Sequence, residues 1–120
     1  DGPPAQAVDI PWPQDGRLQT VCQFVMNSPG VSHTIDDLAA MAGASTRTLI
    51  RLFPKETGLK YHQWVQQVQL AEALCRLGRG ESIARISNFL GYSSPSAFSA
   101  MFKRNFGVTP NQYFQNKSDG

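Results

Sequence analysis

Apolar positions along the chain recur at helical spacing, and their longest run lies near its middle. Between Tyr61 and Leu77 the apolar residues fall mostly three or four positions apart, which predicts a helix with a broad buried face. No residue in this run breaks a helix, and Gly78 and Gly80 are expected to end it. At the usual rise per residue, such a helix is roughly 26 Å long.

The segments on the two sides of this helix repeat one pattern. Residues 34–58 and 82–107 align with an offset of 48 at their start, and the second copy carries one extra residue in its turn. The matched pairs are Thr34 with Ser82, Ile35 with Ile83, Leu38 with Ile86, Gly43 with Gly91, Ser45 with Ser94, Leu49 with Phe98, Phe53 with Phe102 and Gly58 with Gly107. Such an internal repeat indicates two copies of one structural unit.

Each copy has the pattern of a helix, a glycine turn and a second helix, which is typical of a helix-turn-helix. In the first copy Thr34 and Ser45 are expected to cap the two helices, and Gly43 suits a turn that needs a positive φ. Pro54 is expected to end or kink the second helix near Phe53. The predicted inward positions are Ile35, Leu38, Ala39, Ala42, Leu49, Leu52 and Phe53.

The second copy repeats this order, with Ser82 and Ser94 as caps and Pro95 at the first helical position, where proline is favoured. Its predicted inward positions are Ile83, Ile86, Leu90, Phe98, Met101 and Phe102. Residues 109–112 form a further capping pattern, which begins a short final helix in which Tyr113 packs inward.

The N-terminal part divides into a linker and a helix. Residues 1–16 hold four of the eight prolines and no sustained period, so we expect a linker or tail in which Trp12 is exposed. Residues 17–27 predict a helix that Asp15 caps; its apolar stripe comprises Leu18, Val21, Cys22 and Val25. We therefore expect an all-α chain with a linker at 1–16, helix-turn-helix subdomains at 17–58 and 82–116, a long linker helix within 59–81 and a tail at 117–120.

Charge is uneven along the chain. Residues 34–120 hold ten Lys and Arg against six Asp and Glu, a net charge of +4, whereas the first 33 residues carry −2. A mildly basic repeat region fits nucleic acid as a partner without proving it. The two cysteines, Cys22 and Cys75, lie too far apart in the sequence to suggest a disulfide framework, and no run reaches transmembrane length. Because the chain does not begin with Met and shows no signal peptide, we expect a fragment of a longer, cytoplasmic protein.

The repeat also predicts which side chains would contact DNA. In a helix-turn-helix the second helix enters the major groove, and its early exposed residues meet base edges. These positions are Thr46, Arg47, Ile50 and Arg51 in the first copy and Pro95, Ser96, Ser99 and Ala100 in the second. Arg47 and Arg51 share a face, and an arginine that pairs with guanine O6 and N7 supplies about 1–3 kcal/mol of discrimination. The second set is small and weakly polar, so both thymine-methyl contact and a role limited to docking stay open.

Phosphate contacts are expected at helix N-termini, whose backbone N–H groups suit anions, and at two cations further along the second copy. The candidates are Thr34, Ile35, Ser45, Ser82, Ile83, Ser94, Lys103 and Arg104. A central helix of roughly 26 Å could hold two reading helices about 34 Å apart, which is one turn of DNA. One chain could then read two successive major grooves.

These segments resemble the DNA-binding domain of the AraC/XylS family of bacterial transcription regulators over about residues 17–114. The most specific parts are TLIRLFPKETG at 48–58 and LGYSSPSAFSAMFKRNFGVTPNQY at 90–113. The resemblance implies seven helices and binding to promoter DNA, usually as an activator that contacts RNA polymerase. No cofactor or metal is expected, because the residues show no metal-ligand pattern. It also implies that a small-molecule effector would bind a separate N-terminal domain. The motif KYHQW at 60–64 is most similar to members in which that domain is cupin-like. We expect the chain itself to be monomeric.

Several positions depart from the usual family pattern. Pro54 and Ala100 stand where basic residues are common, and Gln69 and Phe114 stand where arginine is common. Each departure removes a cation or a donor, so the resemblance predicts weaker nonspecific affinity than a typical member has.

Two other classes of function can be compared with the sequence, an enzyme and a protein-interaction module. An enzyme is not expected, because no phosphate-binding glycine loop, nucleophile elbow or metal-ligand pattern is present. His33 and His62 are expected to be solvated or helix-capping, and Asp36 and Asp37 to be first-turn helix charges. The serious alternative is a helical protein-interaction module that kept this fold and lost DNA binding; the near-neutral second reading helix favours it, and Arg47 with Arg51 argues against it.

Overall fold

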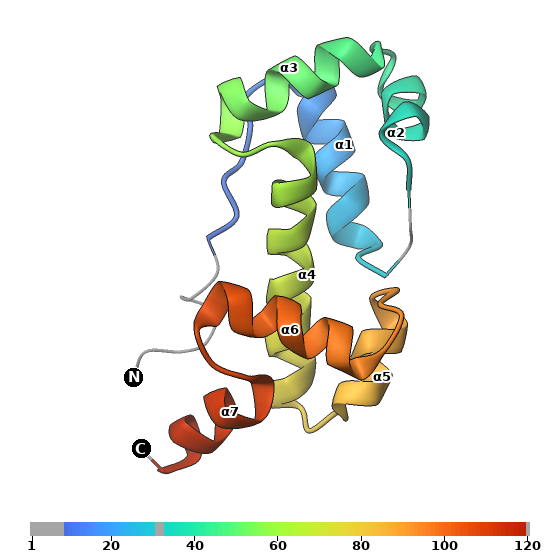
Figure 1. Ribbon diagram of the computed structural model, residues 1–120. Coiled ribbons are helices and arrows are strands. Elements are labelled where there is room, and N and C mark those ends of the chain that lie inside the picture. Colours follow the sequence, from blue (N-terminus) through green and yellow to red (C-terminus); the bar gives the residue numbers. More distant parts are fainter. Residues whose placement is uncertain (1–8, 31–32, 120) are drawn as a thin grey trace. The chain divides into compact units, whose positions relative to one another are not determined.

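The computed structural model describes residues 9–30 and 33–119 of the chain, with side chains described as far as residue 114. Within these ranges the regular structure consists of seven α-helices (Figure 1). They are α1 (Gly16–Asn27), α2 (Ile35–Ala42), α3 (Thr46–Thr57), α4 (Tyr61–Gly78), α5 (Ile83–Phe89), α6 (Pro95–Phe106) and α7 (Pro110–Asp119). The predicted all-α fold of seven helices is confirmed.

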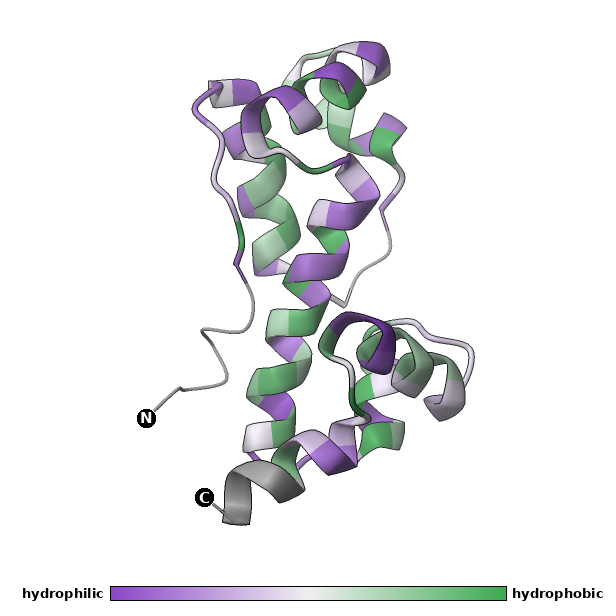
Figure 2. Ribbon diagram, turned by 60° about the vertical axis from the view of Figure 1, so that its left-hand side comes forward, coloured by the Kyte–Doolittle hydropathy of each residue, from purple (hydrophilic) through white to green (hydrophobic). Residues whose placement is uncertain are grey.

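The chain forms two compact units, and the boundary between them falls at Gln69 and Leu70, inside α4. The first unit contains α1, α2, α3 and the first half of α4, and the second contains the rest of α4 with α5, α6 and α7. Hydrophobic residues recur in bands along α4, with hydrophilic residues between them (Figure 2). Each half of α4 thus contributes buried residues to its own unit: Trp64 and Val68 to the first, and Leu70, Ala73 and Leu74 to the second.

Helix α1 supplies one wall of the core of the first unit. Its predicted stripe is buried and consists of Leu18, Val21, Cys22 and Val25. Asp15 caps the helix by accepting hydrogen bonds from two backbone N–H groups of its first turn. Burial raises the pKa of the Cys22 thiol to about 12, so the thiol stays protonated and unreactive at neutral pH.

Trp64 lies at the centre of the first unit, where its side chain is fully buried. The centroid of its ring lies 5.9 Å from that of Phe53 and 6.4 Å from that of Trp12. Its indole N–H donates to the carbonyl of Pro11 at 2.8 Å. A buried donor without a partner would cost roughly 1–3 kcal/mol, so this hydrogen bond helps to fix the segment before α1.

Residues 9–15 pack on the first unit, although the sequence assigned 1–16 to a linker or tail. Pro13 is buried, and two backbone N–H groups just before α1 donate to Glu56 at 2.7 and 3.0 Å. Trp12 is 43% exposed, so only part of its ring meets solvent. Periodicity cannot reveal docking of this kind, because a segment without regular structure has no repeating face. The remainder of the predicted linker lies outside the described residues.

The helix-turn-helix predicted for the first copy is present as α2 and α3. Thr34 and Ser45 cap these helices, and each hydroxyl oxygen accepts the N–H of the third helical residue at 3.1 Å. Gly43 ends α2 with a φ of 71°, a left-handed conformation that residues with a side chain rarely adopt. Leu49 and Phe53 of α3 are fully buried, as their spacing predicts.

Pro54 does not end α3, because the helix continues to Thr57. Of the two outcomes predicted for this proline, the helix end near Phe53 is therefore wrong. The N–H that proline lacks would bond the carbonyl of Ile50, which lies on the exposed face of α3. The last turn is closed by the Gly58 N–H, which donates to the Pro54 carbonyl at 2.9 Å, and by the Thr57 hydroxyl, which donates to the Phe53 carbonyl at 2.7 Å.

The second unit repeats this local design in α5 and α6. Ser82 and Ser94 cap the two helices and accept N–H bonds at 3.1 and 3.0 Å. Gly91 has a φ of 86° in the turn, and Pro95 takes the first position of α6, as predicted. The buried side chains of α5, of its C-terminal cap Leu90 and of α6 include Ile86, Leu90, Phe98, Met101 and Phe102.

Helix α7 begins at the predicted cap. The Gln112 N–H donates to the Thr109 hydroxyl at 3.2 Å, and the Thr109 N–H donates to the Gln112 side-chain oxygen at 3.0 Å. Tyr113 packs edge-on against Phe102 of α6, with ring centroids 5.8 Å apart. The helix runs to Asp119, so the predicted tail after residue 116 begins inside it, and residue 120 lies outside the described residues.

The tolerated proline leads to a stability prediction. Pro54→Ala restores the N–H that Ile50 lacks as a partner, so we expect the free energy of unfolding to rise by about 1–3 kcal/mol. Urea unfolding followed by circular dichroism would measure the change. Lys55→Ala, an exposed neighbour in the same turn, is the control and should change stability by less than about 0.5 kcal/mol. A loss of stability in Pro54→Ala would mean that the proline ring makes contacts that α3 depends on.

Candidate nucleic-acid interface

One face of α3 presents two cations and one apolar side chain. Arg47, Ile50 and Arg51 are exposed and lie three or four residues apart, on the side opposite to the buried Leu49 and Phe53. Neither arginine forms an ion pair within the described part of the chain. Both guanidinium groups are therefore available to an outside partner, and exposed Ile50 adds an apolar contact between them.

Thr46 differs from these three residues, although it was predicted to act with them. It is half-buried at the first position of α3, and its hydroxyl donates to a carboxylate oxygen of Asp36. Asp36 is exposed in the first turn of α2, and the glycine turn brings the two side chains together across ten positions of the sequence. The side chain of Thr46 thus belongs to the contact between the two helices as well as to the exposed face.

The corresponding face of α6 carries short side chains. Pro95, Ser96 and Ala100 are exposed and Ser99 is half-buried, so no long donor projects from the first two turns. Lys103 and Arg104 are exposed in the last turn, and neither forms an ion pair with a described residue. The cations of this helix therefore lie near its C-terminus, at the opposite end from the cap Ser94.

The helix starts that were predicted to bind phosphate differ between the two units. Ile35 and Ile83 are half-buried behind their caps, and Thr34, Ser45 and Ser82 are exposed while Ser94 is half-buried. The first turn of α2 carries two exposed carboxylates, Asp36 and Asp37, whereas the first turn of α5 carries Ala84 and Arg85. The second unit is therefore the more favourable of the two for an anion at this place.

Arg85 is a cation that the sequence reasoning missed. It is exposed in the first turn of α5 and forms no ion pair within the described residues. The signal was present in the repeat, because Arg85 matches Asp37 when the two copies are aligned. A comparison of charges at matched positions would have found this residue, whereas matching the apolar and capping positions did not.

Arg76 holds the end of α4 against α5 within the second unit. Its guanidinium donates to Glu72 at 2.7 Å and to Glu81 at 3.0 Å. It also lies over the ring of Phe89, 3.6 Å from the ring centre. Since Glu81 directly precedes the cap of α5, this cluster fixes the start of that helix.

The two histidines, His33 and His62, lie in different surroundings within the described chain. His62 is exposed, as predicted for a solvated side chain. His33 was also expected to be solvated or capping, but it is half-buried with its ring 4.7 Å from that of Phe24, because Phe24 offers it an apolar surface. Among the described residues, no three His, Cys, Asp or Glu side chains converge into a set that could bind a metal ion.

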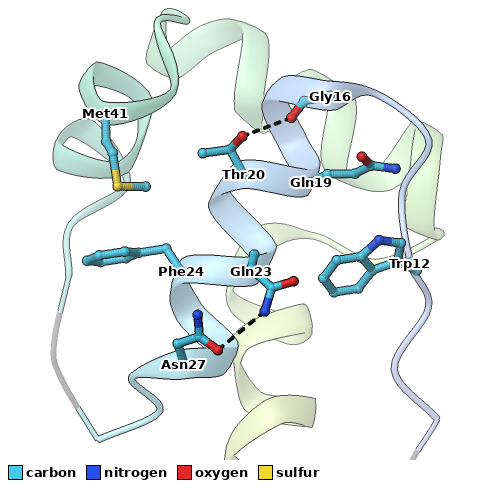
Figure 3. A pocket seen from close by; sticks show the side chains of 8 residues that line it. All are labelled: Trp12, Gly16, Gln19, Thr20, Gln23, Phe24, Asn27 and Met41. Carbon is cyan, nitrogen blue, oxygen red and sulfur yellow. Dashed lines mark hydrogen bonds between the residues drawn. The ribbon is translucent and has the colours of Figure 1, made fainter.

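An open hollow lies on the outer face of α1 (Figure 3). Its lining consists of Trp12, Gly16, Gln19, Thr20, Gln23, Phe24, Asn27 and Met41. None of these residues is charged, and four of them are joined by two hydrogen bonds, Thr20 to Gly16 and Gln23 to Asn27. A hollow without a cation does not suit a phosphate, so the nucleic-acid candidate stays with α3 and α6. In the part of the chain that the structure describes, no helix has both the length and the apolar character needed to cross a lipid bilayer.

Comparison with known proteins gives consistent results. A family model described as "Helix-turn-helix domain" matches residues 38–116. The HTH-type transcriptional regulator NimR of Escherichia coli K12 is 36% identical over 110 residues, which cover 92% of this chain and 40% of NimR. The chain thus spans less than half the length of this curated relative.

Two solved structures share the fold and part of the sequence. An AraC-type DNA-binding transcriptional regulator from Chromobacterium violaceum is 27% identical, with a TM-score of 0.75 over 80% of this chain and 87% of that one. The DNA-binding domain of the transcriptional factor AdpA, solved in complex with a target DNA, is also 27% identical, with a TM-score of 0.73 over 83% of this chain and 90% of that one.

The Arg76 cluster gives a prediction for the second unit. Arg76→Ala removes the contact with Phe89 and two charge-assisted hydrogen bonds, so we expect a loss of about 1–2 kcal/mol of stability. Thermal unfolding followed by circular dichroism would measure it. The matched control is Arg79→Ala, because the side chain of Arg79 is 58% exposed and its guanidinium pairs with Glu81 at the longer distance of 3.7 Å. If the two variants lose the same stability, the cluster does not hold α5.

Proposed function

The chain belongs to the AraC-type helix-turn-helix transcription regulators, and from this premise we propose that it reads promoter DNA by placing α3 and α6 in successive major grooves. As a member it is a DNA-binding domain and not an enzyme. The observation that carries the proposal is the duplicated helix-turn-helix, in which one reading helix exposes two arginines without ion pairs among the described residues.

In the first unit, sequence is read by the exposed face of α3. Arg47 and Arg51 each have the reach and the paired donors to bind guanine O6 and N7. Ile50 is 54% exposed between them and offers an apolar contact for a thymine methyl group. Thr46 contacts the base edge at the start of the helix. This unit supplies most of the base discrimination.

In the second unit, α6 docks closely and reads less. Pro95, Ser96, Ser99 and Ala100 are small enough to let the helix backbone approach the base edges. Lys103 and Arg104 contact phosphates, and exposed Arg85 adds a third cation to this role.

Backbone N–H groups at the helix starts complete the phosphate contacts in both units. The six capping and first-turn residues proposed for this role are Thr34, Ile35, Ser45, Ser82, Ile83 and Ser94. Because Asp36 and Asp37 flank the contact in the first unit, we expect it to be weaker than the one in the second unit.

The remaining parts of the proposal concern the longer protein. The chain covers 40% of NimR, so the proposal includes an additional N-terminal domain that senses a small-molecule effector. Family members usually activate transcription by contacting RNA polymerase, and we propose the same role here, in the cytoplasm. The domain itself acts as a monomer on DNA.

A second candidate function is a helical protein-interaction module. The small, uncharged side chains on the first two turns of α6 favour it. The two functions differ in their dependence on salt, because phosphate contacts release counterions and protein contacts of a neutral surface do not.

Selection of bound duplexes from a random DNA pool at moderate salt tests the proposal. We expect an enriched site in two parts about 10 base pairs apart, since two reading helices on one face of DNA lie one turn apart. Titration at several salt concentrations serves as the control for phosphate contact. An enriched single half-site would remove the second reading helix from the proposal, and no enrichment at any salt concentration would leave the interaction module.

A substitution tests the role of α3. Arg51→Ala should cost about 1–3 kcal/mol of binding free energy and relax the base preference at one position of the first half-site. Fluorescence anisotropy on the selected duplex and on its single-base variants would measure both effects. Lys55→Ala, which removes the same charge one turn later on α3, should leave the base preference unchanged. Equal preferences in the wild type and in Arg51→Ala would exclude Arg51 as a base-reading residue.

A further inference from the structure

Among the exposed residues of the first unit, Asp36 has a contact that the proposed function does not use. Its carboxylate accepts the hydroxyl proton of Thr46, the residue that begins the reading helix α3. The partners belong to different helices of one helix-turn-helix, and the intervening turn is fixed by Gly43 at a φ of 71°. The capping bond of Ser45, 3.1 Å long, fixes the first turn of α3 beside it. The contact is therefore held by both helices rather than by one flexible side chain.

The hydroxyl is the only side-chain donor of Thr46. While it donates to Asp36, it cannot donate to a base, and what remains of the side chain is an acceptor oxygen and a methyl group. Adenine and cytosine present an amino donor in the major groove, and thymine presents a methyl group. Guanine presents only the acceptors N7 and O6 there, so it finds no partner in this side chain.

We infer that Asp36 is a specificity-determining residue of the first reading helix, which excludes guanine at the base that faces Thr46 by occupying the Thr46 hydroxyl. This inference rests on the proposed function and refines it at one base. The exposed carboxylate itself strengthens the exclusion, because a negative charge beside guanine N7 and O6 is unfavourable.

The second unit lacks this arrangement. The position that matches Asp36 is Ala84, and the position that matches Thr46 is Pro95, which has no hydroxyl. The two reading helices therefore differ at their first residue in chemistry as well as in size, and the exclusion is expected only in the first half-site.

Asp37 provides a matched control within the same turn of α2. It is exposed and carries the same charge as Asp36. Its backbone N–H, and not its carboxylate, bonds the cap Thr34, at 3.1 Å, so a substitution of its side chain leaves that bond in place. Asp37→Ala therefore removes one negative charge from the DNA-facing end of α2 without freeing the Thr46 hydroxyl.

The test measures affinities of the whole chain for its selected duplex and for all single-base variants of the first half-site, at one salt concentration. The proteins compared are the wild type, Asp36→Ala, Asp37→Ala, Thr46→Val and Asp36→Ala with Thr46→Val, each checked for folding by thermal unfolding. In the wild type we expect guanine to be the least favoured base at one position. Asp36→Ala should raise the relative affinity for guanine there roughly tenfold, which corresponds to one hydrogen bond to a base edge.

The other variants separate the hydrogen bond from charge. Asp37→Ala should raise affinity for all sequences alike, and Thr46→Val should keep the exclusion of guanine because the hydroxyl is not used in the wild type. The double variant should lose the part of the gain in Asp36→Ala that comes from the freed hydroxyl. The inference is overturned if Asp36→Ala and Asp37→Ala change the preferences equally, or if the wild type prefers guanine and Thr46→Val abolishes that preference. If the wild type enriches no site, the proposed function itself fails; an enriched site with equal preferences in all variants refutes only the role of Asp36.

Discussion

Apart from α4, every helix in the described chain is short, between 7 and 12 residues, so its stability and its register depend on how its first turn is closed. Hydroxyl caps close the first turn of α2, α3, α5 and α6, and a reciprocal cap closes that of α7. Because a cap fixes the first helical residue, it also fixes which side chains face solvent further along. Because Ser45 sets where α3 begins, helical periodicity then determines which positions face solvent and which face the core. Arg47 and Arg51 fall on the exposed face, and Leu49 and Phe53 fall on the buried one.

The two units share this arrangement of capped helices, but their exposed side chains differ in chemistry. In the first unit the exposed face of α3 carries long cationic side chains, while the neighbouring turn of α2 is acidic. In the second unit the early face of α6 is small and uncharged. The cations of this unit without an ion pair among the described residues are Arg85, Lys103 and Arg104. A duplicated scaffold can diverge in this way because the exposed positions contribute little to the buried core that maintains it.

The fold was predictable where its determinants are local. The repeat, the caps and the buried stripes are spacings within one or two turns, and for that reason Gly43, Gly91 and the α1 stripe lie as predicted. The packing of residues 9–15 against Trp64 was not predictable, because it depends on a contact between positions 53 residues apart. The continuation of α3 past Pro54 depends on whether a freed carbonyl meets solvent, which only the packed unit decides.

The candidate site divides in the same way. The exposure of Arg47, Ile50 and Arg51 follows from helical periodicity, whereas the bond between Thr46 and Asp36 depends on the geometry of the turn that joins α2 and α3. Arg85 could have been found from the sequence by comparing charges between the copies. The contacts that these residues make with DNA stay predictions.

The neighbouring rings of Trp12 and Trp64, which are tilted by 50° to each other, have a consequence for how the folding of this chain is observed. These are the two tryptophans of the whole sequence, and both lie in the first unit. Tryptophan fluorescence therefore reports the unfolding of the first unit. The aromatic core of the second unit consists of phenylalanine and tyrosine and does not contribute to this signal. Ellipticity at the helical band reports both units. Different unfolding midpoints from the two signals would accordingly indicate that the units unfold separately. Because fluorescence reports the first unit alone, the signal that changes first would identify the unit that unfolds first.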